Sequence, residues 1–259
     1  MITIKNKEEI EVMSEGGSIL AEILDDLESL VKVGNTTLDI DDRAMELIDH
    51  YKVEPMILGY HPVFANHPYP AATCVSINDQ VVHGIPNHKP YTFKNGDLVS
   101  IDLVIAYKGL VVDSARSLVA GEATSEALAL IGATKEALMA GIKAARPGNR
   151  VKDITMAISG SVPKRFGIVE AFCGHGVGFD LHEAPQVPNV LIGDPGPVLK
   201  PGMVLAIEPM LTMGGHEVEV KNDGYTVVTK DGSLSAHVEH TVAIMKNGPE
   251  ILTKRSKVR

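Results

Sequence analysis

The sequence predicts a single domain of the mixed α+β (α/β) class, built from two equivalent halves that each contain two helices followed by strands. Apolar residues recur at helical spacing in two segments of each half. The remaining apolar runs are β-prone and end at turn residues, as in antiparallel strands. No linker or low-complexity segment divides the 259 residues, so we expect one domain over 1–259.

Four helices are predicted. The first covers residues 7–32, where apolar side chains fall every three or four positions. The second covers 37–51, and Thr37 and Asp39 signal its start. The second pair covers 124–145 and 151–165, separated by the turn sequence Arg146-Pro147-Gly148-Asn149.

The other apolar runs are predicted to be strands. Residues 55–77 are expected to form strand and loop, and 98–107 and 110–119 to pair through a turn at Lys108-Gly109. The proline-rich stretch 185–201 is predicted to be a loop. Further strands are predicted at 80–83, 169–173, 203–213, 216–220, 225–230 and 236–246.

Repeated motifs indicate that the two halves are copies of one ancestral unit. Residues 96–102 read GDLVSID and residues 202–208 read GMVLAIE, so each motif ends in an acid. A His-Gly pair precedes each motif, at 83–84 and at 175–176. We therefore expect a pseudo-two-fold relation that brings Asp102 and Glu208 to equivalent positions on a shared sheet.

Four acids and one histidine lie in or beside apolar runs without a matching set of basic residues. Burying such acids is costly unless something neutralises them, and a bound cation is the usual compensation. The alternative is a set of structural ion pairs, but only Arg116 is near. The pattern favours a two-metal site formed by Asp102, Asp113, His175, Glu208 and Glu239.

Composition limits the possible classes of function. With 24 Lys and Arg against 33 Asp and Glu, the formal charge of −9 argues against a protein surface that binds DNA. No secretory signal and no run of 18 apolar residues is present. Together with only two cysteines, Cys74 and Cys173, these features predict a cytoplasmic protein with reduced thiols and no membrane association.

The motifs resemble those of the type I methionine aminopeptidases, which belong to the pita-bread metallopeptidases. The matching pieces cover essentially the whole chain: CVSINDQVVHGIP at 74–86, NGDLVSIDL at 95–103, CGHGVGFDLHEAPQVPN at 173–189, KPGMVLAIEPM at 200–210 and DGSLSAHVEHTV at 231–242. This resemblance implies a pita-bread fold around a central, curved, antiparallel sheet.

The resemblance also implies roles for the five metal-ligand candidates. Asp113 and Glu239 would bridge two divalent ions, Asp102 would chelate one ion, and His175 and Glu208 would complete the other shell. The ions expected are cobalt, manganese, iron, zinc or nickel, among which the sequence does not choose. Asn78 and Ser235 match a site where the family holds a monovalent cation on loop carbonyls.

Two further histidines are expected to be catalytic by the same resemblance. His182 would hydrogen-bond to the scissile carbonyl or the P1′ amide, and His83 would protonate or orient the leaving amine. The other histidines are predicted to be structural or solvated, although His237 and His240 flank Glu239 and could support it.

A pocket for methionine is expected to be lined by Tyr69, Cys74, Leu181 and Tyr225, together with His83 and His182. Here the chain departs from the family pattern. Leu181 and Tyr225 stand where larger aromatics, Phe and Trp, are common, and the chain has no Trp.

The predicted function is removal of the N-terminal methionine from nascent polypeptides, with a preference for a small second residue. Nascent N-termini are therefore the expected partners, with the ribosome as a further candidate, and we expect a monomer. Two alternatives remain open. A proline-specific aminopeptidase or prolidase shares the fold and ligand types, but those enzymes usually carry an extra N-terminal domain. A non-enzymatic peptide-binding relative is expected to lose ligands, whereas all five are present here.

Overall fold

The computed structural model describes residues 1–254 apart from 64 and 192, so part of the predicted 1–259 domain lies outside the described residues. Its helices lie close to the predicted positions: α1 (Lys7–Glu28), α2 (Thr37–Tyr51), α3 (Ser125–Ala144) and α4 (Val151–Ser161). Within the described residues, no helix is long and apolar enough to cross a membrane.

Local signals fix where the helices begin and end. Asn6 caps α1 in a reciprocal arrangement, in which the amide of Glu9 donates to the Asn6 side chain and the amide of Asn6 donates to the Glu9 carboxylate. The helix ends at Glu28, four residues before the predicted end. The prediction was wrong there because Val31 continues the apolar spacing and is buried in the core outside the helix.

The fourth helix also ends earlier than predicted. It stops at Ser161, whereas the apolar pattern suggested residue 165. Pro163 explains the difference, because the ring of a proline disfavours helical backbone angles in the preceding residue. Val162 accordingly has extended backbone angles.

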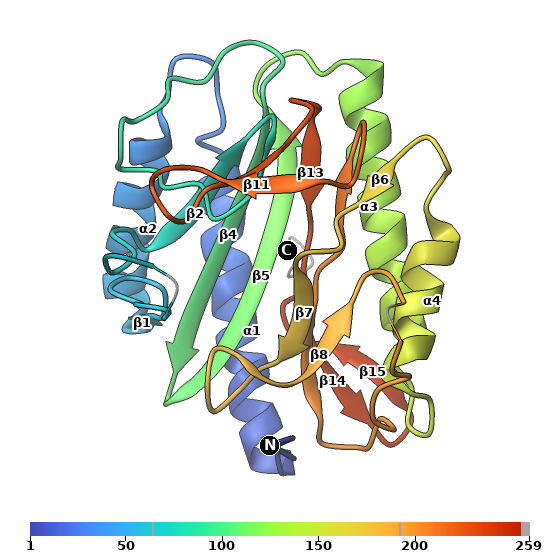
Figure 1. The fold of residues 1–259 in the computed structure, drawn as a ribbon. Coiled ribbons are helices and arrows are strands. Elements are labelled where there is room, and N and C mark those ends of the chain that lie inside the picture. Colours follow the sequence, from blue (N-terminus) through green and yellow to red (C-terminus); the bar gives the residue numbers. More distant parts are fainter. Residues whose placement is uncertain (64, 192, 255–259) are drawn as a thin grey trace.

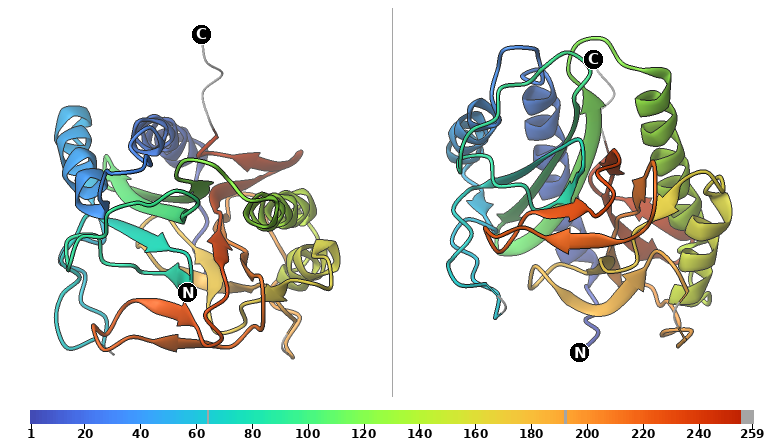
Figure 2. Two further views of the ribbon diagram at one scale, coloured as in Figure 1. Left: turned by 90° about the horizontal axis from the view of Figure 1, so that it is seen from above. Right: turned by 45° about the horizontal axis from the view of Figure 1, so that its top comes forward.

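The described strands form four sheets in which every pairing between named strands is antiparallel. Figure 1 shows them between two helix pairs, α1 with α2 on one side and α3 with α4 on the other. The strands of the first half are β1 (Glu54–Pro55), β2 (Thr73–Ile77), β3 (Gln80–Val82), β4 (Leu98–Tyr107) and β5 (Leu110–Val119). Figure 2 shows the same arrangement from above, with strands of both halves meeting between the helix pairs. The mixed α+β class is therefore confirmed.

The second half contains more and shorter strands than predicted. They are β6 (Gly167–Ile168), β7 (Cys173–Gly176), β8 (Glu183–Pro188), β9 (Val204–Ile207), β10 (Met210–Thr212), β11 (Val218–Val220), β12 (Val227–Thr229), β13 (Ser235–His237), β14 (His240–Met245) and β15 (Gly248–Ile251). In place of the strand predicted at 169–173, the structure has two short strands, β6 and β7, on either side of residues 169–172.

Two predictions in this half were wrong. The stretch 185–201 was predicted to be a loop, yet its first residues belong to β8. That strand lies at the end of the order β15-β14-β9-β7-β8, where a proline can be tolerated because one edge needs no amide donors. The final strand β15 was not predicted; it pairs with β14 through a two-residue turn at Lys246-Asn247.

The predicted strands 203–213 and 236–246 are each interrupted. The first part of 203–213 pairs with the second part of 236–246, as β9 and β14, and the remaining parts pair in a second sheet as β10 and β13. The interruptions fall at Glu208-Pro209 and at Val238-Glu239, where the chain passes from one sheet to the other. Pro209 has no amide hydrogen to donate, which suits it to a break in the ladder.

The core joins α1 to the β4–β5 hairpin. Leu20, Leu24 and Leu27 of α1 are fully buried with Ile101 and Ile105 of β4 in one apolar cluster. The helix also approaches the end of the chain closely, because a Cβ atom added at Gly17 would lie 2.3 Å from the Leu252 carbonyl oxygen.

We expect Gly17→Ala to destabilise the fold by about 1–3 kcal/mol, because backbone must move to admit the methyl group. Gly132→Ala in α3 is the matched control. A Cβ atom there meets nothing within 4 Å, so the better helix propensity of Ala should stabilise by up to about 1 kcal/mol. Urea unfolding of both variants measures the difference. Equal midpoints would contradict the close approach.

Candidate metal centre

The β4–β5 hairpin places two acids side by side. Asp113 lies opposite Val104 in the ladder, and Asp102 lies two residues from Val104 on the same strand. Because alternate residues of a strand point to the same face, the two carboxylates project together from one face of the hairpin. Hydrogen bonds fix Asp113 further, since its amide donates to Thr241 Oγ1 over 2.9 Å and Thr241 Oγ1 donates to its carbonyl over 2.8 Å.

The second half supplies two more acids from the junction between its sheets. Ile207 of β9 pairs with His240 of β14, so the next residues outward, Glu208 and Glu239, lie together at the end of that ladder. The amide of Glu239 donates to the Ala115 carbonyl over 3.0 Å, which ties this end to β5. The acids of both halves therefore meet where the hairpin crosses the sheet junction.

His175 completes the cluster from the neighbouring strand β7, where it pairs with Ala206 of β9. Its Nδ1 donates to the Gly176 carbonyl over 3.0 Å. This bond fixes the tautomer and leaves the lone pair of Nε2 free. Nε2 lies 3.6 Å from Glu208 Oε1 and 3.8 Å from Asp113 Oδ2.

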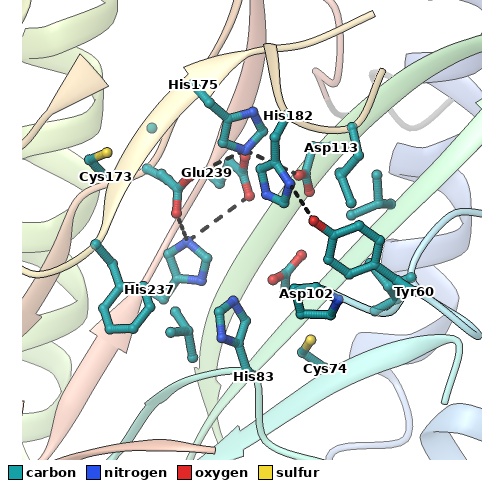
Figure 3. A pocket seen from close by; sticks show the side chains of 18 of the residues that line it. Tyr60, Cys74, His83, Asp102, Asp113, Cys173, His175, His182, His237 and Glu239 are labelled. Carbon is teal, nitrogen blue, oxygen red and sulfur yellow. Dashed lines mark hydrogen bonds and ion pairs between the residues drawn. The ribbon is translucent and has the colours of Figure 1, made fainter. Parts of the chain in front are cut away.

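Figure 3 shows the side chains of Asp102, Asp113, His175 and Glu239 turned toward a common centre. Asp113, His175 and Glu239 each offer one ligand atom, and these three atoms all lie within 4.8 Å of one another. Such a set of carboxylate oxygens with one imidazole nitrogen suits divalent ions of intermediate hardness.

The electrostatics of the cluster call for a cation. Desolvation raises the pKa of Asp102 to about 6, and it raises the pKa of Asp113 and of Glu239 well above the usual range, with repulsion between neighbouring carboxylates adding to the effect. One carboxylate oxygen of each of these three residues is buried without a hydrogen-bond donor. A divalent cation fits here, because it would satisfy those oxygens and offset the like charges.

The basic residue nearest in sequence does not neutralise the cluster. Arg116 follows Asp113 on β5, but its guanidinium bonds to Asp25 and Glu28 of α1 and to the Ala21 carbonyl. The ion-pair alternative considered for the five residues therefore lacks the arginine it required.

The cluster lies at the base of a cavity of about 530 Å³. Every residue predicted for catalysis, substrate binding or metal ligation lines it: Asp102, Asp113, His175, Glu208 and Glu239, with His83, His182, Tyr69, Cys74, Leu181 and Tyr225. Their proposed roles are treated below. Other lining residues that the sequence did not single out include Ile57, Tyr60, Phe172 and Cys173.

The two candidate catalytic histidines favour the neutral state. Desolvation lowers the pKa of His83 to about 4, and His83 stands edge-on to Phe172 with 5.6 Å between ring centroids. The His182 side chain reaches solvent at the cavity mouth, yet partial desolvation together with repulsion from His175 lowers its pKa to about 4. Both imidazoles are therefore neutral near pH 7.

The apolar part of the cavity is framed by two tyrosines. Tyr69 and Tyr225 meet edge to face with 5.1 Å between centroids. The Tyr69 hydroxyl lies 2.9 Å from the Gly84 carbonyl, and the Tyr225 hydroxyl donates to the His67 carbonyl over 2.5 Å. Since both hydroxyls bond to backbone, the rings present their apolar surface beside Cys74 and Leu181.

His237 is a functional candidate that the sequence reasoning left among structural or supporting histidines. It is buried, and its Nε2 lies 3.4 Å from Glu208 Oε2 and 4.0 Å from Glu239 Oε2. Ser117 holds its backbone, donating to the His237 carbonyl and accepting from its amide. The alternation in His237-Val238-Glu239 could have revealed it, because residues two apart on an extended segment share a face.

The residues matched to a monovalent-cation site lie together, outside the residues that line the cavity. Ser235 donates from its amide to the Asn78 carbonyl over 2.8 Å. Asn78 has a positive φ of 56°, which turns its backbone sharply. The cation itself stays a prediction.

Comparisons with known proteins agree with the motifs. A family model described as metallopeptidase family M24 matches residues 11–246. The methionine aminopeptidase of Aquifex aeolicus is 46% identical over 256 residues, which cover 98% of this chain and 99% of that protein. The resemblance proposed from the sequence is thereby confirmed.

Solved structures show the same relation. Methionine aminopeptidase from Thermotoga maritima has a TM-score of 0.93 and 41% identity, covering 98% of this chain and 100% of that chain. Prolidase from Pyrococcus furiosus has a TM-score of 0.73 and 24% identity, covering 98% of this chain and 66% of that chain. The pita-bread fold predicted from the sequence is confirmed, and the prolidase shares that fold.

We expect Asp102→Asn to stabilise the metal-free protein at neutral pH while weakening metal binding. The folded-state pKa of about 6 exceeds the ordinary value of 3.8, so ionisation of Asp102 destabilises the metal-free fold progressively from about pH 4 to pH 6. The gain in unfolding free energy of metal-free Asp102→Asn over wild type should be small at pH 4 and reach about 3 kcal/mol at pH 7.5. Denaturant unfolding in chelator at several pH values measures it, and wild-type protein that is as stable as the variant at pH 7.5 would contradict the assignment.

Proposed function

The chain belongs to metallopeptidase family M24, and we propose that it removes the N-terminal methionine from polypeptides by hydrolysing the first peptide bond. The observation that carries this proposal is the carboxylate cluster with one imidazole at the base of a cavity whose other wall is apolar. Relatives named methionine aminopeptidase, 39–46% identical over nearly the whole chain, support it over the prolidase alternative.

We assign Asp102, Asp113, His175, Glu208 and Glu239 as the ligands of two divalent ions. Divalent ions supply a hydroxide nucleophile at neutral pH and polarise the scissile carbonyl. Asp113 and Glu239 would be the ligands that both ions share, because they come from different halves and lie close together in the cluster (Figure 3). The choice among cobalt, manganese, iron, zinc and nickel rests with metal analysis.

The neutral histidines are assigned to the substrate. His182 at the cavity mouth can donate a hydrogen bond to the scissile carbonyl or the P1′ amide, where charge develops as the carbonyl is attacked. Its Nδ1 lies 3.5 Å from the Tyr60 hydroxyl, which helps orient the ring. Because His83 stays neutral near pH 7, orienting the leaving amine suits it better than protonating that amine. Glu208 is the candidate to shuttle the proton.

The apolar wall is proposed to hold the methionine side chain. Cys74, Tyr69, Leu181 and Tyr225 offer soft, apolar contacts to an unbranched thioether. Branching at Cβ is expected to be rejected, because a slot that suits an unbranched side chain penalises branching close to the backbone. Nascent chains are the proposed natural substrates, and the ribosome is a proposed place of encounter.

The substrate prediction is that Met-Ala-Ser is cleaved in the presence of a divalent ion and not after chelation. Methionine should be preferred to leucine at P1 by about tenfold, or ~1.4 kcal/mol, because Leu181 and Tyr225 leave some room. Val and Ile should be rejected. Comparing kcat/KM for Xaa-Ala-Ser tripeptides and for Xaa-Pro dipeptides tests this. Leucine cleaved as well as methionine, or faster cleavage of Xaa-Pro, would overturn the assignment.

The catalytic prediction concerns His182. His182→Ala should lower kcat by roughly 10² or more, the scale of losing one preorganised donor, while bound metal per chain stays unchanged. The exposed His216, changed to Ala, is the matched control and should retain wild-type kcat. Loss of metal from His182→Ala would instead make this histidine a ligand and require a new ligand set.

A further inference from the structure

The first residues of the chain pack against the loop that carries His182. Ile2 forms a parallel β-bridge with Ala184, and the amide of Lys5 donates to the Gly202 carbonyl over 2.7 Å. Residues 2–5, here termed the N-terminal arm, therefore contact both the start of β8 and the segment just before β9.

A buried ion pair joins the arm to this loop. Lys5 Nζ donates to Glu183 Oε2 over 2.5 Å, with the two side chains 0% and 4% exposed. Thr3 Oγ1 bonds to the same carboxylate oxygen and accepts a hydrogen bond from Lys5 Nζ. The pair is thus isolated from water and satisfied by its own neighbours.

The other oxygen of Glu183 closes the loop on itself. Glu183 Oε1 accepts from the amides of Phe179, over 2.6 Å, and Asp180, over 3.2 Å. Leu181 and His182 lie inside the turn that these bonds close. A shift of the carboxylate would consequently move both cavity-lining residues.

The loop is also shaped around the lysine. Gly178 has φ +145°, and a Cβ atom there would lie 2.2 Å from Lys5 Cε. Lys5 Nζ stands 5.2 Å from the centroid of the Phe179 ring, within cation–π range. The amide of Val111 donates to the Gly178 carbonyl over 2.7 Å, which anchors the far side of the loop to β5.

Burying a lysine and a glutamate together is weak evidence for a gain in stability, because desolvation opposes the attraction of the two charges. Such a pair does impose one geometry, since Lys5 bonds to both Thr3 and Glu183, and both oxygens of Glu183 accept hydrogen bonds. The residue that this pair holds in place is Glu183, which follows His182 in the sequence and itself lines the cavity.

We propose that Lys5 is a positioning residue for the peptidase reaction. Acting through Glu183, with Thr3 in support, it holds the turn that sets His182 toward the scissile bond and Leu181 against the P1 side chain. This inference rests on the proposed function, because it assigns to Lys5 the placement of groups that act on the substrate.

The test is a double-mutant cycle with Lys5→Met and Glu183→Gln, measured as kcat and KM on Met-Ala-Ser and Leu-Ala-Ser. Lys5→Met should lower kcat by about 10- to 100-fold, the loss expected from misplacing a catalytic group by about 1 Å. Methionine-over-leucine discrimination should fall as well, with bound metal per chain unchanged. In the Glu183→Gln background, adding Lys5→Met should change kcat less than about threefold, because the pair acts as one unit.

Lys7→Met is the matched control, since Lys7 makes an exposed contact of 3.4 Å with Glu11 and does not reach the loop. It should keep wild-type kcat. Unchanged kcat in Lys5→Met with a wild-type circular dichroism spectrum, or independent effects in the cycle, would overturn the inference.

Two milder variants keep the test decisive if Lys5→Met does not fold. Thr3→Val removes one hydroxyl, and Glu183→Gln keeps an acceptor while removing the charge. Each should lower kcat with metal content unchanged, and wild-type kcat in both would overturn the inference. Failure of the wild-type protein to cleave Met-Ala-Ser would instead count against the proposed function, so the two failures are distinguishable.

Discussion

The constraint on which the site depends is the burial of like-charged carboxylates at the meeting of two sheets. Asp102, Asp113 and Glu239 each bury an oxygen that no protein donor reaches. In a metal-free interior such oxygens favour protonation, which is the physical content of their raised pKa values. The surroundings are therefore arranged for a charge that the polypeptide itself does not provide.

The fold delivers that arrangement through backbone pairing across the two halves. Hydrogen bonds from Asp113 to Thr241 and from Glu239 to Ala115 fasten β5 to the β9–β14 ladder. A side chain at the junction can reach the centre because the ladder stops there. Glu208 follows the end of β9, and Glu239 precedes the start of β14. Because neither acid is part of the ladder, both side chains can reach the centre of the site.

Much of this was predictable because local patterns decide it. The strands on either side of Lys108-Gly109 are nearly continuous β-prone apolar runs joined by a turn, and α2 has a capping box at its start, so their bounds agree with the predictions. Pro209 marks the interruption after Glu208, because proline cannot donate to a ladder, whereas no Pro or Gly marks the interruption at Val238-Glu239. Lys5 gave no signal of its own, because its burial and its partner Glu183, 178 residues away, define its role.

The distance in sequence between the site's members bears on how the protein acquires its activity. Thr241 and Asp113 are separated by 128 residues, yet their mutual hydrogen bonds hold one edge of the site. Contacts of such long range form late in folding, because the entropy of closing the intervening loop opposes them until much of the chain is in place. A chain still being synthesised, complete through β10 but not β13, holds the hairpin acids, His175 and Glu208 without Glu239. The four acids and the histidine, with the Thr241 hydrogen bonds that hold Asp113, are therefore complete only once the chain has been made through the start of β14.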